Sequence, residues 1–265
     1  MPASDAASEE LNGMTTILVT GGTGTLGRHV VGRLRTGAQE VRVLSRHSQP
    51  YAVDLRRGGS TLDTAVTGVD TIVHCASTPR GGDEAAARNL LAAARRAGVG
   101  HLVYISITGV DQVPFGYYRA KSAVERLTEE SGLGWTVLRT TRFHDLVFTL
   151  LRHLSRAPVL LLPARVKDQP IGVSEVADRL AELARGGPAG RVTDMGGPEV
   201  RTFESLARSY LEAAGRRRAV LKVPLRGAAY RAFRAGGHLA REHAVGKVTF
   251  EDFPAARAER ARAGG

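Results

Sequence analysis

A serine, a tyrosine and a lysine form the set of residues in this sequence that is best suited to acid–base chemistry. Tyr117 and Lys121 are four residues apart in a segment of helical character, so both side chains are expected on one face of a helix. An ammonium group close to a phenol favours the phenolate, which suits a tyrosine for proton transfer. Ser106 ends the preceding apolar run and is expected to donate a hydrogen bond to a substrate oxygen. We therefore predict that Ser106, Tyr117 and Lys121 are catalytic.

A second candidate site is the glycine-rich segment TGGTGTLG, residues 20–27. It stands between a β-branched run and an apolar run with helical spacing, and its glycines follow the pattern G-x-x-G-x-x-G. Such glycines let the backbone approach a pyrophosphate, and the free N–H groups of the following helix attract its charge. This context predicts a dinucleotide site. The residues expected to contact the cofactor are Gly21, Thr23, Gly24, Thr25, Leu26 and Gly27.

The end of the second predicted strand indicates which dinucleotide is bound. An acidic residue at this point would accept a hydrogen bond from the ribose 2′-hydroxyl of NAD, whereas an arginine accommodates the 2′-phosphate of NADP. The sequence here is LSRH, residues 44–47, with no acid and with Arg46 in the relevant position. We predict a preference for NADP(H) over NAD(H). The alternative is that Arg46 is an ordinary surface arginine.

Two further segments are predicted to contact the cofactor. Asp54 and Leu55 follow a weak third strand, where a carboxylate can accept a hydrogen bond from the adenine amino group, although a turn or cap role for Asp54 stays open. Cys75, Ala76 and Ser77 end the fourth strand with small side chains that let the backbone run close to a ligand. We interpret Cys75 as a small apolar residue and not as a nucleophile.

These residues would be positioned by an alternation of strands and helices. Such alternation predicts an α/β fold with a doubly wound parallel (Rossmann) sheet, whose carboxyl-terminal strand ends share one ligand-binding edge. The predicted strands are 16–20, 40–45, 52–55, 71–75, 101–106 and 135–139, and the predicted helices are 26–35, 61–67, 83–97 and 117–131.

After residue 139 the alternation loosens, which indicates a small α/β substrate lobe interleaved with the core. Ser174 and Thr202 are predicted as helix N-caps. Helices are expected at 143–154, 174–185, 202–214 and 225–240, and short strands at 166–173, 191–195 and 220–223. The expected organisation is a disordered tail at 1–13, a core at 14–142, the lobe at 143–254 and a frayed end at 255–265.

The lobe is expected to provide the substrate contacts. Thr140, Phe143 and His144 lie just past the sixth predicted strand, where they would face a substrate, although a structural role for His144 stays open. No spacing of histidine, cysteine or acidic residues indicates a metal site.

Composition narrows the classes of partner. The 265 residues carry a formal net charge of +11, but the basic residues are spread along the chain and are not interleaved with aromatic ones, which disfavours nucleic-acid binding. There is no apolar run of membrane-spanning length, no signal-peptide pattern and only one cysteine. We expect a cytoplasmic protein, a monomer or homodimer, whose partner is a small-molecule substrate.

Four segments resemble the atypical and extended short-chain dehydrogenases/reductases, and most closely their NmrA-like group of NAD(P)-binding proteins. They are TGGTGTLG at 20–27, NLLAAARRAGVGHLVYIS at 89–106, YYRAKSAVE at 117–125 and WTVLRTTRFHD at 135–145. The resemblance extends over about residues 14–254 and is specific for fold and cofactor rather than for substrate.

The resemblance implies a reductase. Tyr117 would protonate a carbonyl oxygen as hydride arrives from NADPH, Lys121 would hold the nicotinamide ribose, and Ser106 would orient the carbonyl. We therefore predict an NADP(H)-dependent oxidoreductase acting on a carbonyl, a quinone or a similar small molecule. In this family the tyrosine is often missing, and some members sense the cofactor without catalysis. The alternatives are therefore an NADP(H)-sensing regulator and a nucleotide-sugar epimerase or dehydratase.

Overall fold

The computed structural model describes residues 15–78 and 81–253, and the predicted tail at 1–13 and frayed end at 255–265 lie outside these residues. The chain divides into two compact units. Unit 1 consists of the chain up to Ile105, Ala123–Val137 and Ala177–Val192. Unit 2 consists of Ser106–Ser122, Leu138–Val176 and the chain from Thr193 onward.

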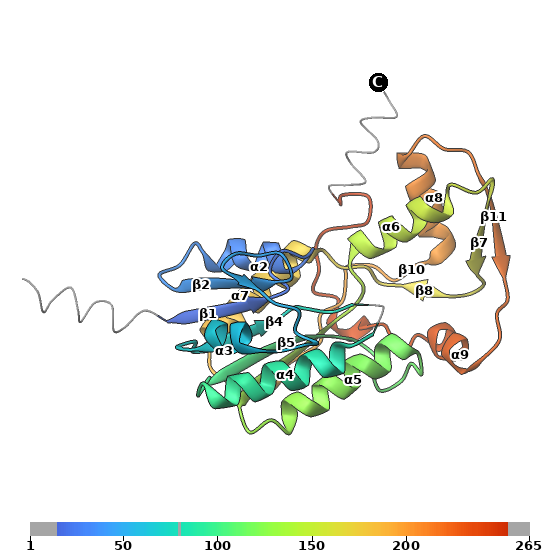
Figure 1. Cartoon of the computed structure of the whole chain (residues 1–265). Coiled ribbons are helices and arrows are strands. Elements are labelled where there is room, and N and C mark those ends of the chain that lie inside the picture. Colours follow the sequence, from blue (N-terminus) through green and yellow to red (C-terminus); the bar gives the residue numbers. More distant parts are fainter. Residues whose placement is uncertain (1–14, 79–80, 254–265) are drawn as a thin grey trace, which may run out of the picture. The chain divides into compact units, whose positions relative to one another are not determined.

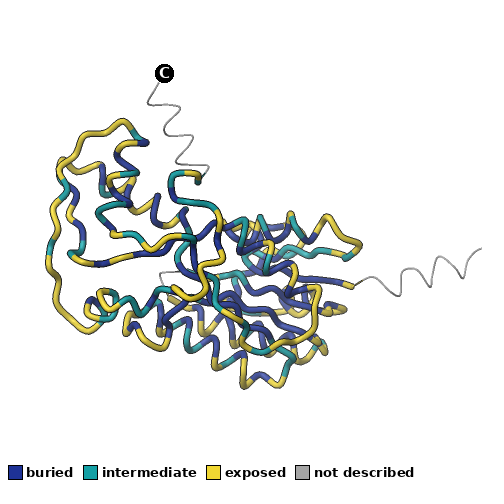
Figure 2. The backbone as a smooth tube through the Cα atoms, turned by 180° about the vertical axis from the view of Figure 1, so that it is seen from behind, coloured by how far each residue is buried: buried dark blue, intermediate teal, exposed yellow. Residues whose placement is uncertain are grey.

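A seven-stranded parallel sheet forms the centre of unit 1, in the order β3-β2-β1-β4-β5-β6-β9 (Figure 1). This confirms the predicted Rossmann architecture. Figure 2 shows that the central strands are buried, as expected for a sheet covered on both faces. The strands are β1 (Thr16–Thr20), β2 (Glu40–Ser45), β3 (Tyr51–Ala52), β4 (Thr71–His74), β5 (His101–Ile107), β6 (Gly134–Thr140) and β9 (Gly190–Arg191). The last of these replaces the predicted strand at 191–195.

Helices cover both faces of this sheet (Figure 1). On one face, α2 (Gly27–Leu34) is joined to α7 (Val173–Arg185) by the Arg33–Asp178 ion pair at 2.5 Å. The opposite face carries α3 (Ser60–Val66) and α4 (Asp83–Arg96). A further helix, α5, spans Gly116–Glu129.

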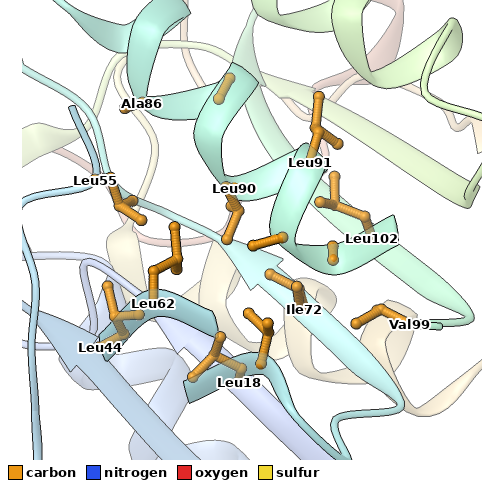
Figure 3. Packing of buried hydrophobic residues seen from close by; sticks show 14 of the residues in the cluster. Leu18, Leu44, Leu55, Leu62, Ile72, Ala86, Leu90, Leu91, Val99 and Leu102 are labelled. Atoms are coloured by element: carbon orange, nitrogen blue, oxygen red, sulfur yellow. The ribbon is translucent and has the colours of Figure 1, made fainter. Parts of the chain in front are cut away.

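The core on the α3 and α4 face follows from the spacing of apolar residues (Figure 3). Alternate strand residues such as Leu18 and Ile72 point toward the helices, and residues such as Leu62 and Leu90 point back at them. At the edge of this cluster lies Trp135, which is partly buried and is the only tryptophan in the sequence. The hydrophobic core therefore fixes the strand ends that position the glycine-rich turn.

Unit 2 contains two small sheets and three further helices. The sheets pair β7 (Val159–Pro163) in parallel with β11 (Ala219–Val223), and β8 (Lys167–Asp168) antiparallel with β10 (Arg201–Thr202). The helices are α6 (His144–Leu154), α8 (Phe203–Ala213) and α9 (Ala228–Ala235), with a short 3₁₀ turn at Arg241–His243.

Three predictions for unit 2 need correction. The strand expected at 166–173 is only two residues long, because Pro170 cannot donate a backbone hydrogen bond. The helix expected at 225–240 spans only Ala228–Ala235, because Gly236 ends it in the left-handed conformation at φ 84°. The helix expected to be capped by Ser174 begins at Val173 instead.

The predicted cap at Thr202 is confirmed, since its hydroxyl accepts a hydrogen bond from the Ser205 N–H at 3.0 Å. We expect Thr202→Ala to lower the free energy of unfolding by about 1 kcal/mol, because the Ser205 N–H loses its acceptor. Thermal and urea denaturation would measure this loss. Thr202→Ser should retain wild-type stability, and equal destabilisation by both substitutions would contradict the capping role.

Candidate functional site

The glycine-rich turn lies between the end of β1 and the start of α2, as predicted. Gly21 has φ 65°, and a Cβ atom there would lie 2.8 Å from the Ala76 Cα. A Cβ atom on Gly27 would lie 2.2 Å from the Gly21 oxygen. The turn is closed by the Gly24 N–H, which donates to the Gly21 oxygen at 2.9 Å. These short distances exclude any larger side chain at Gly21 and Gly27, and the backbone of the turn lies close to the end of β4.

The same turn presents hydrogen-bond donors that suit a pyrophosphate. Helix α2 has no acidic residue in its first turn and no side-chain cap. Within residues 15–78 and 81–253, no backbone carbonyl accepts a hydrogen bond from the N–H groups of Thr25 and Leu26. Thr23, Gly24 and Thr25 are exposed. A cradle of glycines with unsatisfied N–H groups at a helix start fits a dinucleotide phosphate.

A buried contact between two polar side chains, which was not predicted, lies beside the glycine-rich turn. The Thr20 hydroxyl lies 2.7 Å from His74 Nδ1 and links the ends of β1 and β4. The His74 ring stacks on Tyr104, with 5.5 Å between centroids. The Ala76 N–H donates to the Thr20 hydroxyl at 3.4 Å. The only indication of this contact in the sequence is that Thr20 and His74 lie at or near the ends of predicted strands. The two residues are 54 positions apart, so the sequence does not show that they meet.

The loop after β2 holds Arg46 in an exposed position. Ser48 fixes the loop, because its hydroxyl accepts from the Ser45 N–H at 2.7 Å and donates to the Tyr51 oxygen at 2.9 Å. Among the described residues no carboxylate forms an ion pair with Arg46. His47 is also exposed beside it and was not singled out from the sequence. A rigid loop therefore presents an uncompensated cation.

Asp54, which was predicted to contact the adenine, is paired with a neighbouring arginine. Both of its carboxylate oxygens accept from Arg56, at 2.6–3.2 Å. The hydrogen bonds from Arg56 lower the pKa of Asp54 to about 2, so the group is ionised at neutral pH. Leu55 is buried, and its carbonyl accepts from Asn89 Nδ2 at 2.8 Å. The carboxylate retains lone pairs for a further donor.

The segment after β4 is ordered by one carboxylate. Asp83, the first residue of α4, accepts from the Ser77 hydroxyl at 2.6 Å and from the Thr78 N–H at 2.9 Å. Cys75 is partly buried, and its N–H donates to the backbone carbonyl oxygen of Thr20 at 3.2 Å. The small size of Ala76 is explained by its contact with the glycine-rich turn.

Unit 2 brings Tyr117 and Lys121 together as predicted. Both lie on α5, and Lys121 Nζ is 5.8 Å from the centre of the Tyr117 ring. Lys121 is 4% exposed, whereas Tyr117 is half-buried. Ser106 lies near the end of β5, is 4% exposed, and its hydroxyl has no hydrogen-bond partner among the described residues. A buried hydroxyl without a partner has a donor to offer a ligand.

The neighbouring tyrosine has a different environment. Tyr118 is 2% exposed and packs edge-on against Phe233, with 5.7 Å between ring centroids. Burial raises the pKa of Tyr118, despite the opposing effect of the nearby Arg142 guanidinium. Of the two adjacent tyrosines, only Tyr117 is therefore accessible to a ligand.

The residues predicted to contact the substrate are less accessible. Thr140 is buried, and its backbone carbonyl oxygen accepts a hydrogen bond from the Thr108 N–H at 3.0 Å. Phe143 is half-buried at the start of α6. His144 is 1% exposed, lies 2.9 Å from the Val248 oxygen through Nε2, and has its pKa lowered by burial. These surroundings favour the structural alternative for His144.

Sequence reasoning also missed a buried ion pair in unit 2. Asp168 is fully buried and accepts from Arg142 Nη1 at 2.5 Å. Arg142 also stacks over Phe233, at 5.1 Å from the ring centre. In the sequence both are ordinary charged residues of a charge-rich chain, so nothing distinguished them. They join the segment after β6 to β8.

Within residues 15–78 and 81–253, no helix combines the length and the apolarity that crossing a bilayer requires. In the same residues no three histidine, cysteine or acidic side chains gather in an arrangement suited to a metal ion.

Comparison with known proteins agrees with the geometry of the glycine-rich turn. A family model described as NAD(P)H-binding matches residues 21–184. The chain belongs to this NAD(P)H-binding family. This membership confirms the NAD(P)-binding family that the motifs indicated, and the matched range begins within the glycine-rich turn, at Gly21.

Two curated relatives of this family member are a reductase and an oxidoreductase. One is a (4-alkanoyl-5-oxo-2,5-dihydrofuran-3-yl)methyl phosphate reductase from Streptomyces griseus, 30% identical over 76% of this chain and 74% of that protein. The other is quinone oxidoreductase 2 from Escherichia coli, 26% identical over 76% of this chain and 75% of that protein.

Solved structures show the same fold. The NADPH complex of a quinone oxidoreductase from Escherichia coli matches with a TM-score of 0.66 and 18% identity, over 92% of this chain and 94% of that one. A UDP-glucose 4-epimerase from Thermus thermophilus, bound to NAD, matches with a TM-score of 0.70 and 22% identity, over 95% and 99%.

Proposed function

We propose that this NAD(P)H-binding protein is an NADP(H)-dependent oxidoreductase that reduces a carbonyl compound or a quinone. The observation that carries the proposal is the pairing of Tyr117 with the buried Lys121, together with the Ser106 hydroxyl that lacks a partner among the described residues. The reductase from Streptomyces griseus and the quinone oxidoreductase from Escherichia coli support the reaction class.

In this proposal each residue of the set has one role. When bound, the cofactor supplies the hydride. Ser106 donates a hydrogen bond to the substrate oxygen, which stabilises the charge that develops there. Tyr117 Oη gives its proton to that oxygen, and the Lys121 ammonium stabilises the phenolate that remains. Lys121 also has donors for the nicotinamide ribose.

The proposed cofactor contacts use the donors of unit 1. The N–H groups of Thr25 and Leu26 bind the pyrophosphate, with Gly21 and Gly24 allowing its approach. Arg46 binds the 2′-phosphate of the adenosine ribose. The remaining predicted contacts, including the adenine contacts of Asp54 and Leu55, are part of the same proposal.

Turnover of the purified protein tests the proposal. We expect NADPH to be oxidised in the presence of a member of a panel of quinones, aldehydes and enones, and NADH to be oxidised more slowly. Binding of NADPH without turnover of any of these substrates would contradict an enzymatic role and favour the cofactor-sensing alternative. Conversion of a nucleotide sugar without net oxidation of cofactor would favour an epimerase.

Arg46→Ala should weaken NADPH binding and leave NADH binding unchanged. The lost charge-assisted hydrogen bond corresponds to about 1.5–3 kcal/mol, or roughly ten- to a hundredfold in affinity. Fluorescence titration with each cofactor measures this difference. Arg35→Ala removes an exposed arginine at the opposite end of α2 and is the matched control. Equal loss of NADPH and NADH affinity in Arg46→Ala would contradict the assignment.

A further inference from the structure

Three arginines line a surface hollow in unit 2 that the proposed reaction does not use. The hollow has a volume of about 410 Å³ and is bounded by Arg165, Arg231, Arg234 and Ala235. Arg165 follows β7, and the other residues belong to α9, which Figure 1 labels. A volume of this size is in the range of small-molecule sites and exceeds what a single inorganic anion fills.

Helix α9 is held so that its arginines face the hollow. Arg231 and Arg234 are three residues apart and therefore lie on one side of the helix. Tyr230 is 8% exposed, and its hydroxyl donates to the Ala164 oxygen at 2.6 Å, which fixes α9 to the residue before Arg165. The Arg234 guanidinium stacks over the Tyr230 ring at 5.6 Å. Two sides of the hollow are thus joined by a direct contact.

The backbone at Arg165 is strained. Its φ of 60° makes it the one non-glycine residue with positive φ in the described part of the chain. Glycine would adopt this conformation without steric cost, whereas a longer side chain costs about 1 kcal/mol. Strain of this kind is concentrated at ligand-binding positions. In this conformation the Arg165 side chain lines the hollow.

None of the three guanidinium groups has a neutralising carboxylate partner among residues 15–78 and 81–253. Some cations of unit 2 are paired, such as Lys222 with Glu204 at 2.9 Å. Among the described residues, no ion pair involves Arg165, Arg231 or Arg234. Like charges around one hollow repel each other, so a dianion bound there would relieve this repulsion. The planar guanidinium matches phosphate oxygens in a bidentate manner.

We propose that this hollow binds the phosphate group of a small phosphate monoester, with the ester's organic part filling the remaining volume. Arg165, Arg231 and Arg234 bind the phosphate oxygens, and Tyr230 positions α9. The proposal does not depend on reductase activity, because it concerns binding at residues that have no part in the proposed reaction.

Calorimetric titration of the full chain with phenyl phosphate tests the proposal at physiological salt. We expect saturable binding that weakens by roughly tenfold in each of Arg165→Gln, Arg231→Gln and Arg234→Gln. Arg217→Gln removes an exposed arginine elsewhere in unit 2 and should bind like the wild type. Tyr230→Phe keeps all charges but loses the contact with Ala164, so it should also weaken binding.

Several outcomes would overturn the proposal. These are the absence of saturable binding, unchanged binding in the three hollow variants, and an equal loss in Arg217→Gln, which would indicate a general effect of surface charge. Inorganic phosphate that binds as tightly as phenyl phosphate would contradict the ester class. NADPH titration and thermal denaturation of each variant serve as folding controls, and normal NADPH turnover with no phenyl phosphate binding would reject this site alone.

Discussion

Tyr117→Phe should leave NADPH binding unchanged and lower turnover by about 10²–10⁴-fold. The substitution removes one hydroxyl from a half-buried ring, so it changes neither the glycine-rich turn nor the core of unit 1. What it removes is the group that gives a proton to the substrate oxygen, and general acid catalysis contributes an effect of this size. The Lys121 ammonium is retained but has no phenolate to stabilise.

Single-turnover and steady-state kinetics, combined with NADPH fluorescence titration, separate these effects. Tyr118→Phe is the matched control, because it removes the same atom from the adjacent, buried ring. We expect kcat of Tyr118→Phe within a few-fold of wild type, with a small change in thermal stability. A Tyr117→Phe protein with wild-type kcat would show that another group donates the proton.

Gly27→Ala should weaken binding of both cofactors by roughly a hundredfold, which corresponds to about 3 kcal/mol. The added methyl group would lie 2.2 Å from the Gly21 oxygen and 2.7 Å from the Gly22 Cα. These are backbone atoms, so the clash is relieved only if the turn opens. An opened turn no longer directs the N–H groups of Thr25 and Leu26 at a pyrophosphate.

Gly32→Ala in the same helix provides the control. A Cβ atom at Gly32 meets nothing within 4 Å, and alanine is the better helix former by about 0.5–1 kcal/mol. This variant should therefore bind cofactor normally and unfold at a slightly higher temperature. Normal NADPH affinity in a folded Gly27→Ala protein would contradict the role of the turn.

The Rossmann part of the fold was predictable because its signals are local. Strands such as β1 and β4 are short β-branched runs, and α4 shows continuous helical spacing that ends at a glycine. Hydrogen bonds between nearby residues define the helices among these elements, as the bond from the Ala97 N–H to the Ala93 carbonyl does at the end of α4. The parallel order then follows from the alternation of strands and helices.

Unit 2 was less predictable because its elements depend on distant partners. Strand β7 was missed, since Val159–Pro163 is an apolar run without periodicity. Its partner β11 lies some sixty residues later, and only the pairing of Leu160 with Val220 and its neighbours defines the strand. The short helix α9 was overextended, because a glycine within an apolar pattern does not by itself reveal where a helix ends.

The candidate site shows the same division. The glycine spacing and the Tyr117–Lys121 spacing are periodic features of one segment, so they were visible in the sequence. The Thr20–His74 contact and the Arg142–Asp168 ion pair each join residues that are far apart in the chain. Burial gives these polar groups their importance, and burial is a property of the assembled core.

The single tryptophan makes it possible to observe one unit separately. Trp135 packs at the edge of the unit 1 core, so its emission spectrum responds to solvation of that unit, whereas far-ultraviolet circular dichroism responds to the helices of both units. If both signals change at one denaturant concentration, the chain unfolds as a single cooperative system. If they separate, the emission trace follows the dinucleotide-binding unit on its own, without any engineered label.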